Sequence, residues 1–150
     1  MLMERIERIV LPMCSEKANK KIDSMISIVD MSRFEIGGIL DKDFLNGNEE
    51  ITKVFEQNYP RILKKLYMIN VPTVFNIAWK TMSWMLSDKF KAKIQMLGED
   101  WQKTIEKEVT SVKNLPKSLG GGNPTPILEY RNFWDEEYYK SFKEHRFTRK

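Results

Sequence analysis

The sequence contains a single cysteine and a single histidine. Cys14 alone cannot form an intrachain disulfide, which favours a reducing, cytoplasmic compartment. The same scarcity excludes zinc sites built from cysteine and histidine. His145 stands among charged residues near the end of the chain, so the positioned imidazole that serine and cysteine nucleophiles need is not expected. These absences argue against an enzyme and give no reason to expect a cofactor or a metal.

Long apolar segments are absent as well. No stretch reaches the run of about 20 apolar residues that a membrane-spanning helix needs. Glu4 and Arg5 interrupt the apolar residues at the start of the chain, unlike a signal peptide. Hydrophobic residues make up 41% of the sequence and charged residues 31%, which is typical of a globular domain rather than a disordered chain.

The positive charge is mild and dispersed. The formal net charge is +4, and acidic residues lie among the basic ones almost everywhere, whereas nucleic-acid-binding proteins gather lysine and arginine on one face. No nucleic-acid partner is therefore expected. The basic pair Lys64–Lys65 and the group Lys89, Lys91 and Lys93 fit either a solvated surface or a weak attraction to an anionic membrane surface.

Glycine is scarce, and its one run of three does not have the spacing of a phosphate-binding loop. Gly120–Gly122 follows Leu115–Pro116 and precedes a further proline, without the G-x-G-x-x-G or G-x-x-x-x-G-K pattern. After the first predicted strand, where a nucleotide-binding fold places its glycines, stands Arg33–Ile36. A small nucleotide-type α/β enzyme is therefore only an unfavoured alternative.

Hydrophobic periodicity predicts an α/β fold. Short, β-branched or apolar segments predict buried strands, and segments of helical period alternate with them. The predicted strands are residues 26–31, 66–69 and 93–97. The predicted helices are residues 2–17, 51–59, 74–86 and 99–109, with a shorter helical turn through Lys91. Such alternation is typical of a mostly parallel sheet with flanking helices. Pro12 is expected to kink or end the first helix.

Ligands in sheets of this kind gather beyond the carboxyl ends of the strands. That rule directs attention to residues 32–36, residues 70–75 and the region after Leu97.

The segment from Thr73 to Ser87 has more apolar surface than an ordinary surface helix. Its polar residues step by three and four and form one narrow stripe, which comprises Thr73, Asn76, Lys80, Ser83 and Ser87. Nearly all the remaining residues are apolar, whereas a surface helix normally has one apolar stripe and a broad polar face. The helix could be buried on most sides, could lie between the sheet and an apolar cavity or membrane, or could form a protein interface.

Several short motifs, in order along residues 4–122, are similar to those of the CRAL-TRIO lipid-binding family. They are Val29–Met31, Gln57–Pro60, Leu66–Pro72 followed by Phe75 and Trp79, Lys93–Ile94, and Leu115–Gly121. The resemblance starts inside the family's pattern, without its N-terminal helical region and first strand. It implies a lipid-binding domain over residues 1–126, followed by a charged and aromatic tail over residues 127–150.

The resemblance implies a fold in which a sheet floor and a helical lid enclose an apolar pocket for one lipid. The helix after N-x-P-x-x-F would be its mobile gate. The implied function is to bind a phospholipid or similar hydrophobic lipid and to transfer or present it between membranes, from the cytoplasm and with transient peripheral membrane contact. A lipid-free module that uses the apolar 74–86 helix for protein contacts is the alternative. The sequence gives no indication of oligomeric state.

Candidate site residues follow from the resemblance and from the apolar surplus of the 74–86 helix. The expected lipid-binding residues are Phe34, Ile36, Tyr59, Phe75, Trp79, Met82, Phe90 and Lys93. The expected membrane-contact residues are Trp84, Met85, Lys89 and Lys91. Members of the family that bind phosphatidylinositol have a glutamate where this chain has Arg61 and a threonine where it has Phe90. Only Lys93 remains of that trio, so no strong preference for phosphatidylinositol is expected.

Overall fold

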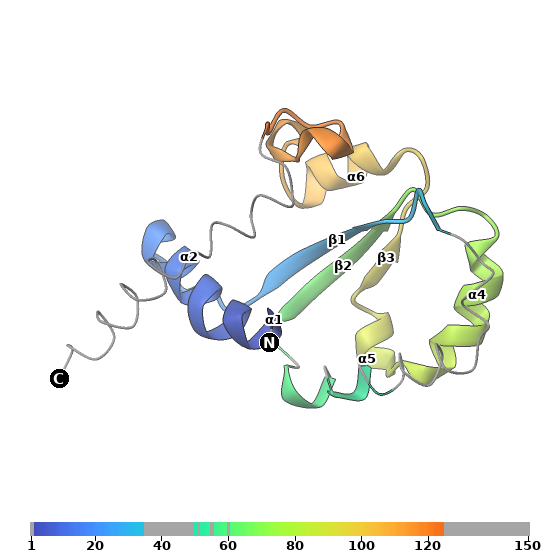
Figure 1. Ribbon diagram of the computed structural model, residues 1–150, viewed down its shortest axis with the longest axis horizontal. Helices are drawn as coiled ribbons and strands as arrows, with labels where there is room; N and C mark the ends of the chain where they lie inside the picture. The colour runs from blue at the N-terminus through green and yellow to red at the C-terminus, as the bar shows by residue number, and fades with distance from the viewer. Residues whose placement is uncertain (1, 35–49, 51, 55, 60, 125–150) are drawn as a thin grey trace. The chain divides into compact units, whose positions relative to one another are not determined.

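The computed structural model describes residues 2–34, 50, 52–54, 56–59 and 61–124. The chain divides into two compact units, with the division after Trp101. The first unit contains a three-stranded parallel sheet in the order β1-β2-β3, formed by β1 (Met25–Asp30), β2 (Leu63–Ile69) and β3 (Ile94–Met96) (Figure 1). The predicted α/β class with parallel strands is confirmed.

Strand β2 begins earlier than the apolar segment predicted. It includes Lys64 and Lys65, because a strand directs alternate side chains to opposite faces and can hold charged residues among apolar ones. Lys64 is exposed, and the Lys65 Nζ lies 4.8 Å from the centroid of the buried Tyr67 ring. The aliphatic part of the Lys65 side chain is thus packed, while its ammonium lies over the face of the Tyr67 ring.

The N-terminal helix continues past its proline. It consists of α1 (Leu2–Arg5), the π-helical turn η1 (Ile6–Val10) and α2 (Leu11–Ala18). Of the two outcomes expected at Pro12, a kink or an end of the helix, the end is therefore wrong. The Leu11 N–H donates to the Ile6 carbonyl across a widened π turn directly before the proline. Such a turn accommodates the ring and the missing N–H where a regular helix would clash.

The connection from β2 to β3 is helical, as predicted by the helix over residues 74–86 and the shorter helical turn through Lys91, but the first α-helix ends at Met82 rather than at Leu86. The α-helical part, α4 (Phe75–Met82), gives way to a 3-10 turn, η3 (Ser83–Met85), and α5 (Asp88–Lys91) follows. The Ser87 Oγ accepts a hydrogen bond from the Phe90 N–H at 3.1 Å and caps α5. Helices α4 and α5 lead the chain from the carboxyl end of β2 back to the amino end of β3 (Figure 1).

Burial is concentrated on one face of β2. Tyr67 is 1% exposed and Ile69 0%, whereas Leu66 and Met68, which point to the opposite face, are only half-buried. Residues 52–54 and 56–58, which precede β2, are helical, as predicted for the 51–59 segment.

The second unit begins within α6 (Trp101–Glu108), which confirms the helix predicted over 99–109. The 3-10 turns η4 (Val112–Asn114) and η5 (Lys117–Leu119) follow. The glycine run has a structural role here: a Cβ at Gly121 would collide with the Leu115 carbonyl, and the Gly121 N–H donates to the Pro116 carbonyl at 3.1 Å. Only glycine fits this turn.

Candidate functional site

The strand register places five apolar side chains on one face of the sheet. Leu66 pairs with Ile94, and Met68 pairs with both Val29 and Met96, so these side chains point to the same side. None of them is fully buried, and Val29 and Met96 are 39% and 36% exposed. This set (Val29, Leu66, Met68, Ile94 and Met96) is called the apolar floor below. A sheet face with this composition is normally covered by other apolar groups.

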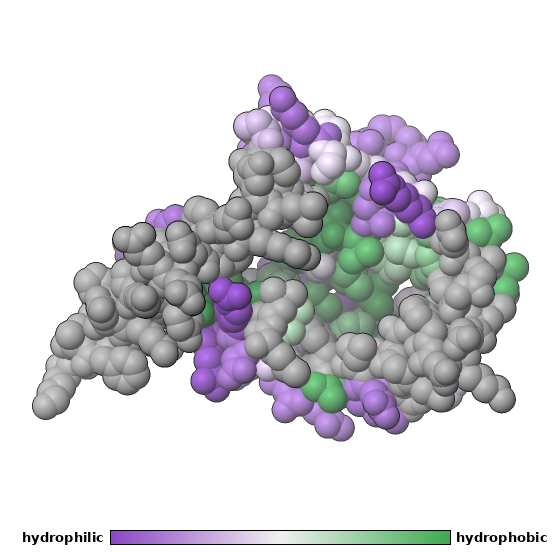
Figure 2. Space-filling view, in the orientation of Figure 1, coloured by the Kyte–Doolittle hydropathy of each residue, from purple (hydrophilic) through white to green (hydrophobic). Residues whose placement is uncertain are grey.

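Helix α4 packs against part of this floor. Phe75 and Ala78 are 3% and 0% exposed and form a cluster with half-buried apolar residues from the strand ends and the helix itself. The half-buried members are Met31, Phe34, Met68, Val71, Trp79 and Met82. The cluster contains Met68 alone among the floor residues. In Figure 2, apolar side chains gather in the hollow over the strands.

Aromatic rings order the contact at the carboxyl ends of the strands. The Phe34 and Phe75 rings lie edge to face, with centroids 5.0 Å apart and an interplanar angle of 83°. The Trp79 ring lies 6.2 Å from that of Phe75. Both separations suit favourable aromatic pairing. These rings join the start of α4 to the segment after β1, and the cluster as a whole brings together four of the predicted lipid-binding residues: Phe34, Phe75, Trp79 and Met82.

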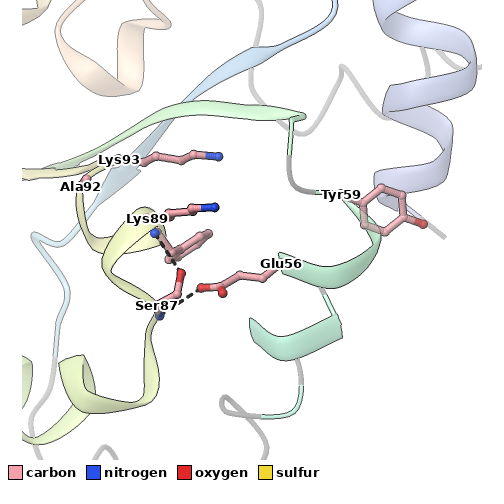
Figure 3. Close-up of a pocket in the computed structure, with 7 residues that line it drawn as sticks. Glu56, Tyr59, Ser87, Lys89, Ala92 and Lys93 are labelled. Atoms are coloured by element: carbon pink, nitrogen blue, oxygen red, sulfur yellow. Dashed lines mark hydrogen bonds between the residues drawn. The ribbon is translucent and has the colours of Figure 1, made fainter.

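A cavity of about 530 Å³ lies at the other end of the strands, near the start of β3. The residues that line it are Glu56, Tyr59, Ser87, Lys89, Phe90, Ala92 and Lys93. The Lys89 and Lys93 side chains extend in the same direction, and the Glu56 side chain reaches towards Ser87 from the facing segment (Figure 3). This cavity is at the amino end of β3, whereas the general rule directed attention to the carboxyl ends.

The Glu56 carboxylate is held in place within this cavity. Its Oε1 accepts a hydrogen bond from the Ser87 N–H at 3.3 Å. The bond joins the helical residues before β2 to the segment that enters α5. Glu56 is half-buried, Lys89 is exposed and Lys93 is half-buried.

The predicted lipid-binding residues therefore fall into two groups. Tyr59, Phe90 and Lys93 line the cavity, while Phe34, Phe75, Trp79 and Met82 belong to the separate α4 cluster. Ile36 lies outside the described residues. Arg61 does not line this cavity but a second one of about 580 Å³, on the side of α2 and also bordered by Tyr59.

The four expected membrane-contact residues differ in exposure. Trp84 is 70% exposed, Lys89 is exposed, and Met85 and Lys91 are half-buried. The Lys91 Nζ lies 2.7 Å from the Asp88 Oδ1, and this hydrogen bond and charge hold the pKa of Asp88 below its usual value. The ammonium of Lys91 is thus already paired.

Sequence reasoning missed the apolar floor and one patch of α4. Val74 and Ile77 were counted only in the apolar surplus of the 74–86 helix and not as site residues, and they are 51% and 63% exposed. The floor required the register that pairs β2 with β3. Residues 66–69 are all apolar in the sequence, and only tertiary packing tells which face of the strand stays open.

At the carboxyl ends of the strands, a polar contact joins β1 to the segment that enters α4. Asn70 Nδ2 donates to Asp30 Oδ1 at 2.9 Å, and the Ser32 N–H donates to the same oxygen at 3.0 Å. The Asn70 hydrogen bond is the largest cause that holds the pKa of Asp30 below its usual value, against a smaller opposing effect of burial.

In the residues that the structure describes, none of the helices has the length and apolar character to cross a bilayer. Among the same residues, His, Cys, Asp and Glu do not gather in a group of three or more that could hold a metal ion.

The pattern of the CRAL/TRIO domain family matches residues 1–121. The chain belongs to this family. It is 32% identical over 125 residues to the phosphatidylinositol/phosphatidylcholine transfer protein SFH12 of Arabidopsis thaliana, across 81% of this chain and 22% of that protein. It is 30% identical over 142 residues to the SEC14 cytosolic factor of Kluyveromyces lactis, across 91% of this chain and 46% of that protein.

The fold of this CRAL/TRIO chain is similar to that of a solved structure, the crystal structure of Sfh5. The TM-score is 0.55 at 20% identity, over 71% of this chain and 37% of that one. The chain spans less than half the length of each of these relatives.

Proposed function

We propose that this CRAL/TRIO chain binds one phospholipid or similar hydrophobic lipid and transfers or presents it between membranes. The observation that carries the proposal is the apolar floor, whose side chains remain half-buried or exposed and which contacts the equally apolar helix α4 only through Met68. Two of its relatives are named as a phosphatidylinositol/phosphatidylcholine transfer protein and a cytosolic factor, which supports a lipid ligand and a cytosolic protein.

Acyl chains would lie on the floor, with Trp79 and Met82 beside them. Each methylene group transferred from water to an apolar surface contributes about 0.8 kcal/mol. A chain of ordinary length therefore supplies most of the binding free energy. Methionine and aromatic side chains adapt to irregular apolar ligands, and Met68, Met82 and Met96 supply this property around the floor.

The head group would occupy the cavity near the start of β3. Lys93 and Lys89 supply the positive charge for a lipid phosphate. Arg61, which replaces the glutamate expected for phosphatidylinositol binding, lines the second cavity instead. Phe90 replaces the expected threonine with a side chain that offers no hydrogen bond. These two departures favour recognition of the phosphate without a strong preference for inositol.

The outer side of α4 would contact the membrane while lipid enters or leaves. Val74 directly before α4, Ile77 on α4 and Trp84 in the turn η3 are each more than half exposed. Large apolar groups that cluster on a surface in this way often mark a contact site. Trp84 suits the interface between acyl chains and head groups. Lys89 adds attraction to anionic lipid. Such contact would be transient and peripheral.

Mass spectrometry of an organic extract of the purified chain tests the proposal. We expect a retained phospholipid in about equimolar amount when the chain is expressed in cells or incubated with phospholipid vesicles and re-isolated. An extract without lipid after both treatments, from protein with the circular dichroism of a folded α/β domain, would contradict the proposed function.

A further inference from the structure

The cavity near the start of β3 carries charges of both signs on facing segments. Lys89 comes from α5 and Lys93 directly precedes β3, while Glu56 comes from the helical residues before β2. Figure 3 shows the two lysine side chains extending together and the Glu56 carboxylate reaching the rim at Ser87. A ligand that fills this space therefore meets two cationic donors and, at the rim beside Ser87, an anionic acceptor.

The acid is not needed to bind a phosphate. A phosphodiester is attracted by the lysines and repelled by a carboxylate in the same cavity. The hydrogen bond from the Ser87 N–H to Glu56 Oε1 nevertheless fixes the carboxylate there, at 3.3 Å. An ionised carboxylate accepts about four hydrogen bonds, so this one bond leaves it able to accept others from a ligand.

The three charges have a matching pattern in one class of head group. An aminophospholipid carries a phosphate for the lysines and a primary ammonium, a donor of three hydrogen bonds, for Glu56. A choline head group has the positive charge but no N–H donor. An inositol head group has hydroxyl donors but no positive charge. In a serine head group a carboxylate adds a second anion for the second lysine.

We propose that this cavity recognises the head group of an aminophospholipid and that Glu56 is the residue that determines this specificity. The inference rests on the proposed lipid-binding function and names the head group for that same site. Glu56 contacts the ammonium, and Lys89 and Lys93 contact the phosphate and, in phosphatidylserine, the carboxylate. Electrostatic matching of this kind decides which ligand is chosen more than how tightly it binds.

A competition experiment with the full chain tests the assignment. The protein is incubated with vesicles of equimolar phosphatidylserine, phosphatidylethanolamine, phosphatidylcholine and phosphatidylinositol, re-isolated, and its lipid identified by mass spectrometry. We expect aminophospholipid to be enriched over phosphatidylcholine by about tenfold, which corresponds to one charge-assisted hydrogen bond. If phosphatidylserine is enriched over phosphatidylethanolamine, both lysines contact anionic groups of the head group. If the two lipids are enriched equally, the ammonium alone is recognised beside the phosphate.

Glu56→Gln is the decisive variant, because the amide oxygen still accepts from the Ser87 N–H while the charge is lost. We expect the share of aminophospholipid in the lipid bound by this variant to fall to about its share in the vesicles. Glu16→Gln, on the exposed surface of α2 and outside both cavities, is the matched control and should keep the preference. If Glu56→Gln does not fold, Lys89→Gln replaces it and should lower phosphatidylserine relative to phosphatidylethanolamine.

The outcomes separate this inference from the function on which it rests. Bound lipid in proportion to the vesicle mixture, or an enrichment that Glu56→Gln leaves unchanged, overturns the assignment to Glu56 while lipid binding stands. A protein that takes up none of the four lipids overturns the proposed function, and the head-group assignment with it.

Discussion

Asn70 donates a hydrogen bond to Asp30 across the carboxyl ends of β2 and β1, at 2.9 Å between Nδ2 and Oδ1. Asn70 has a φ of 54°, in the left-handed region, and directly precedes Val71 and Pro72, which lead into α4. The Val71 N–H donates to the Leu97 carbonyl at 3.0 Å. One side chain therefore fixes the turn from which α4 departs.

Replacement of Asn70 should separate the two contributions of this residue. Asn70→Ala loses the hydrogen bond and also holds an alanine in the left-handed region, which is unfavourable for a residue with a Cβ. We expect it to lower the free energy of unfolding by about 2 kcal/mol. Asn70→Gly loses only the hydrogen bond and should cost about 1 kcal/mol less, since glycine adopts positive φ freely. Urea denaturation measures both. If the two variants lose the same unfolding free energy, the left-handed backbone at position 70 does not contribute to the cost, which would contradict this account.

Acid should weaken the same contact. The hydrogen bonds from Asn70 and Ser32 hold the pKa of Asp30 below its usual value. Because the folded-state pKa is the lower one, the stabilisation is fully present above the unfolded pKa of about 4 and is lost as the pH falls through the folded pKa. Asp30 is exposed, so we expect less than about 1 kcal/mol from it. The difference in unfolding free energy between wild type and Asp30→Asn should shrink between pH 6 and pH 3, and a constant difference would contradict the account.

A carboxylate beside the floor should prevent lipid uptake. Trp79→Asp places a charge among apolar groups, and burial of an unpaired charge under acyl chains is strongly unfavourable. We expect the variant to lose uptake of a fluorescent phospholipid from vesicles. Asn76→Asp, on the same helix but exposed, introduces the same charge and should keep most of the uptake. Full uptake by a folded Trp79→Asp variant would place Trp79 outside the site.

Membrane contact should depend on one lysine more than on its neighbour. Lys89 is exposed, whereas Lys91 is paired with Asp88 at 2.7 Å. In co-sedimentation with anionic vesicles, Lys89→Glu should therefore weaken binding more than Lys91→Glu. The difference should fade with added salt as the Debye length falls below about 8 Å. Wild-type binding that ignores both vesicle charge and salt, without a change in tryptophan fluorescence, would contradict contact through this region.

The sequence predicts the layer structure well, because local patterns determine it. Segments such as Ile26–Met31 have the β-branched character of buried strands, and Trp101, Ile105 and Val109 recur at helical spacing. The start of β2 was missed because Lys64 and Lys65 conceal its alternation. The helix predicted over residues 2–17 is present, but the π turn that accommodates Pro12 was missed because it has no local signature.

The candidate site was less accessible to sequence reasoning. Tyr59, Phe90 and Lys93 were named through the family resemblance, and the cavity brings them together. Glu56 was not named, because its hydrogen bond to Ser87 joins residues 31 positions apart. The floor depends on the register of Leu66 with Ile94 and of Met68 with Met96, which long-range pairing decides.

Photo-crosslinking with a phospholipid that carries a diazirine in its acyl chain tests the central claim most directly. After uptake, removal of free vesicles and irradiation, peptide mass spectrometry locates the adducts. We predict adducts on the floor residues Met68 and Met96 and on the facing residues Trp79 and Met82. Bound lipid whose adducts fall only on the exposed residues Val74, Ile77 and Trp84, with none on the floor, would contradict the account.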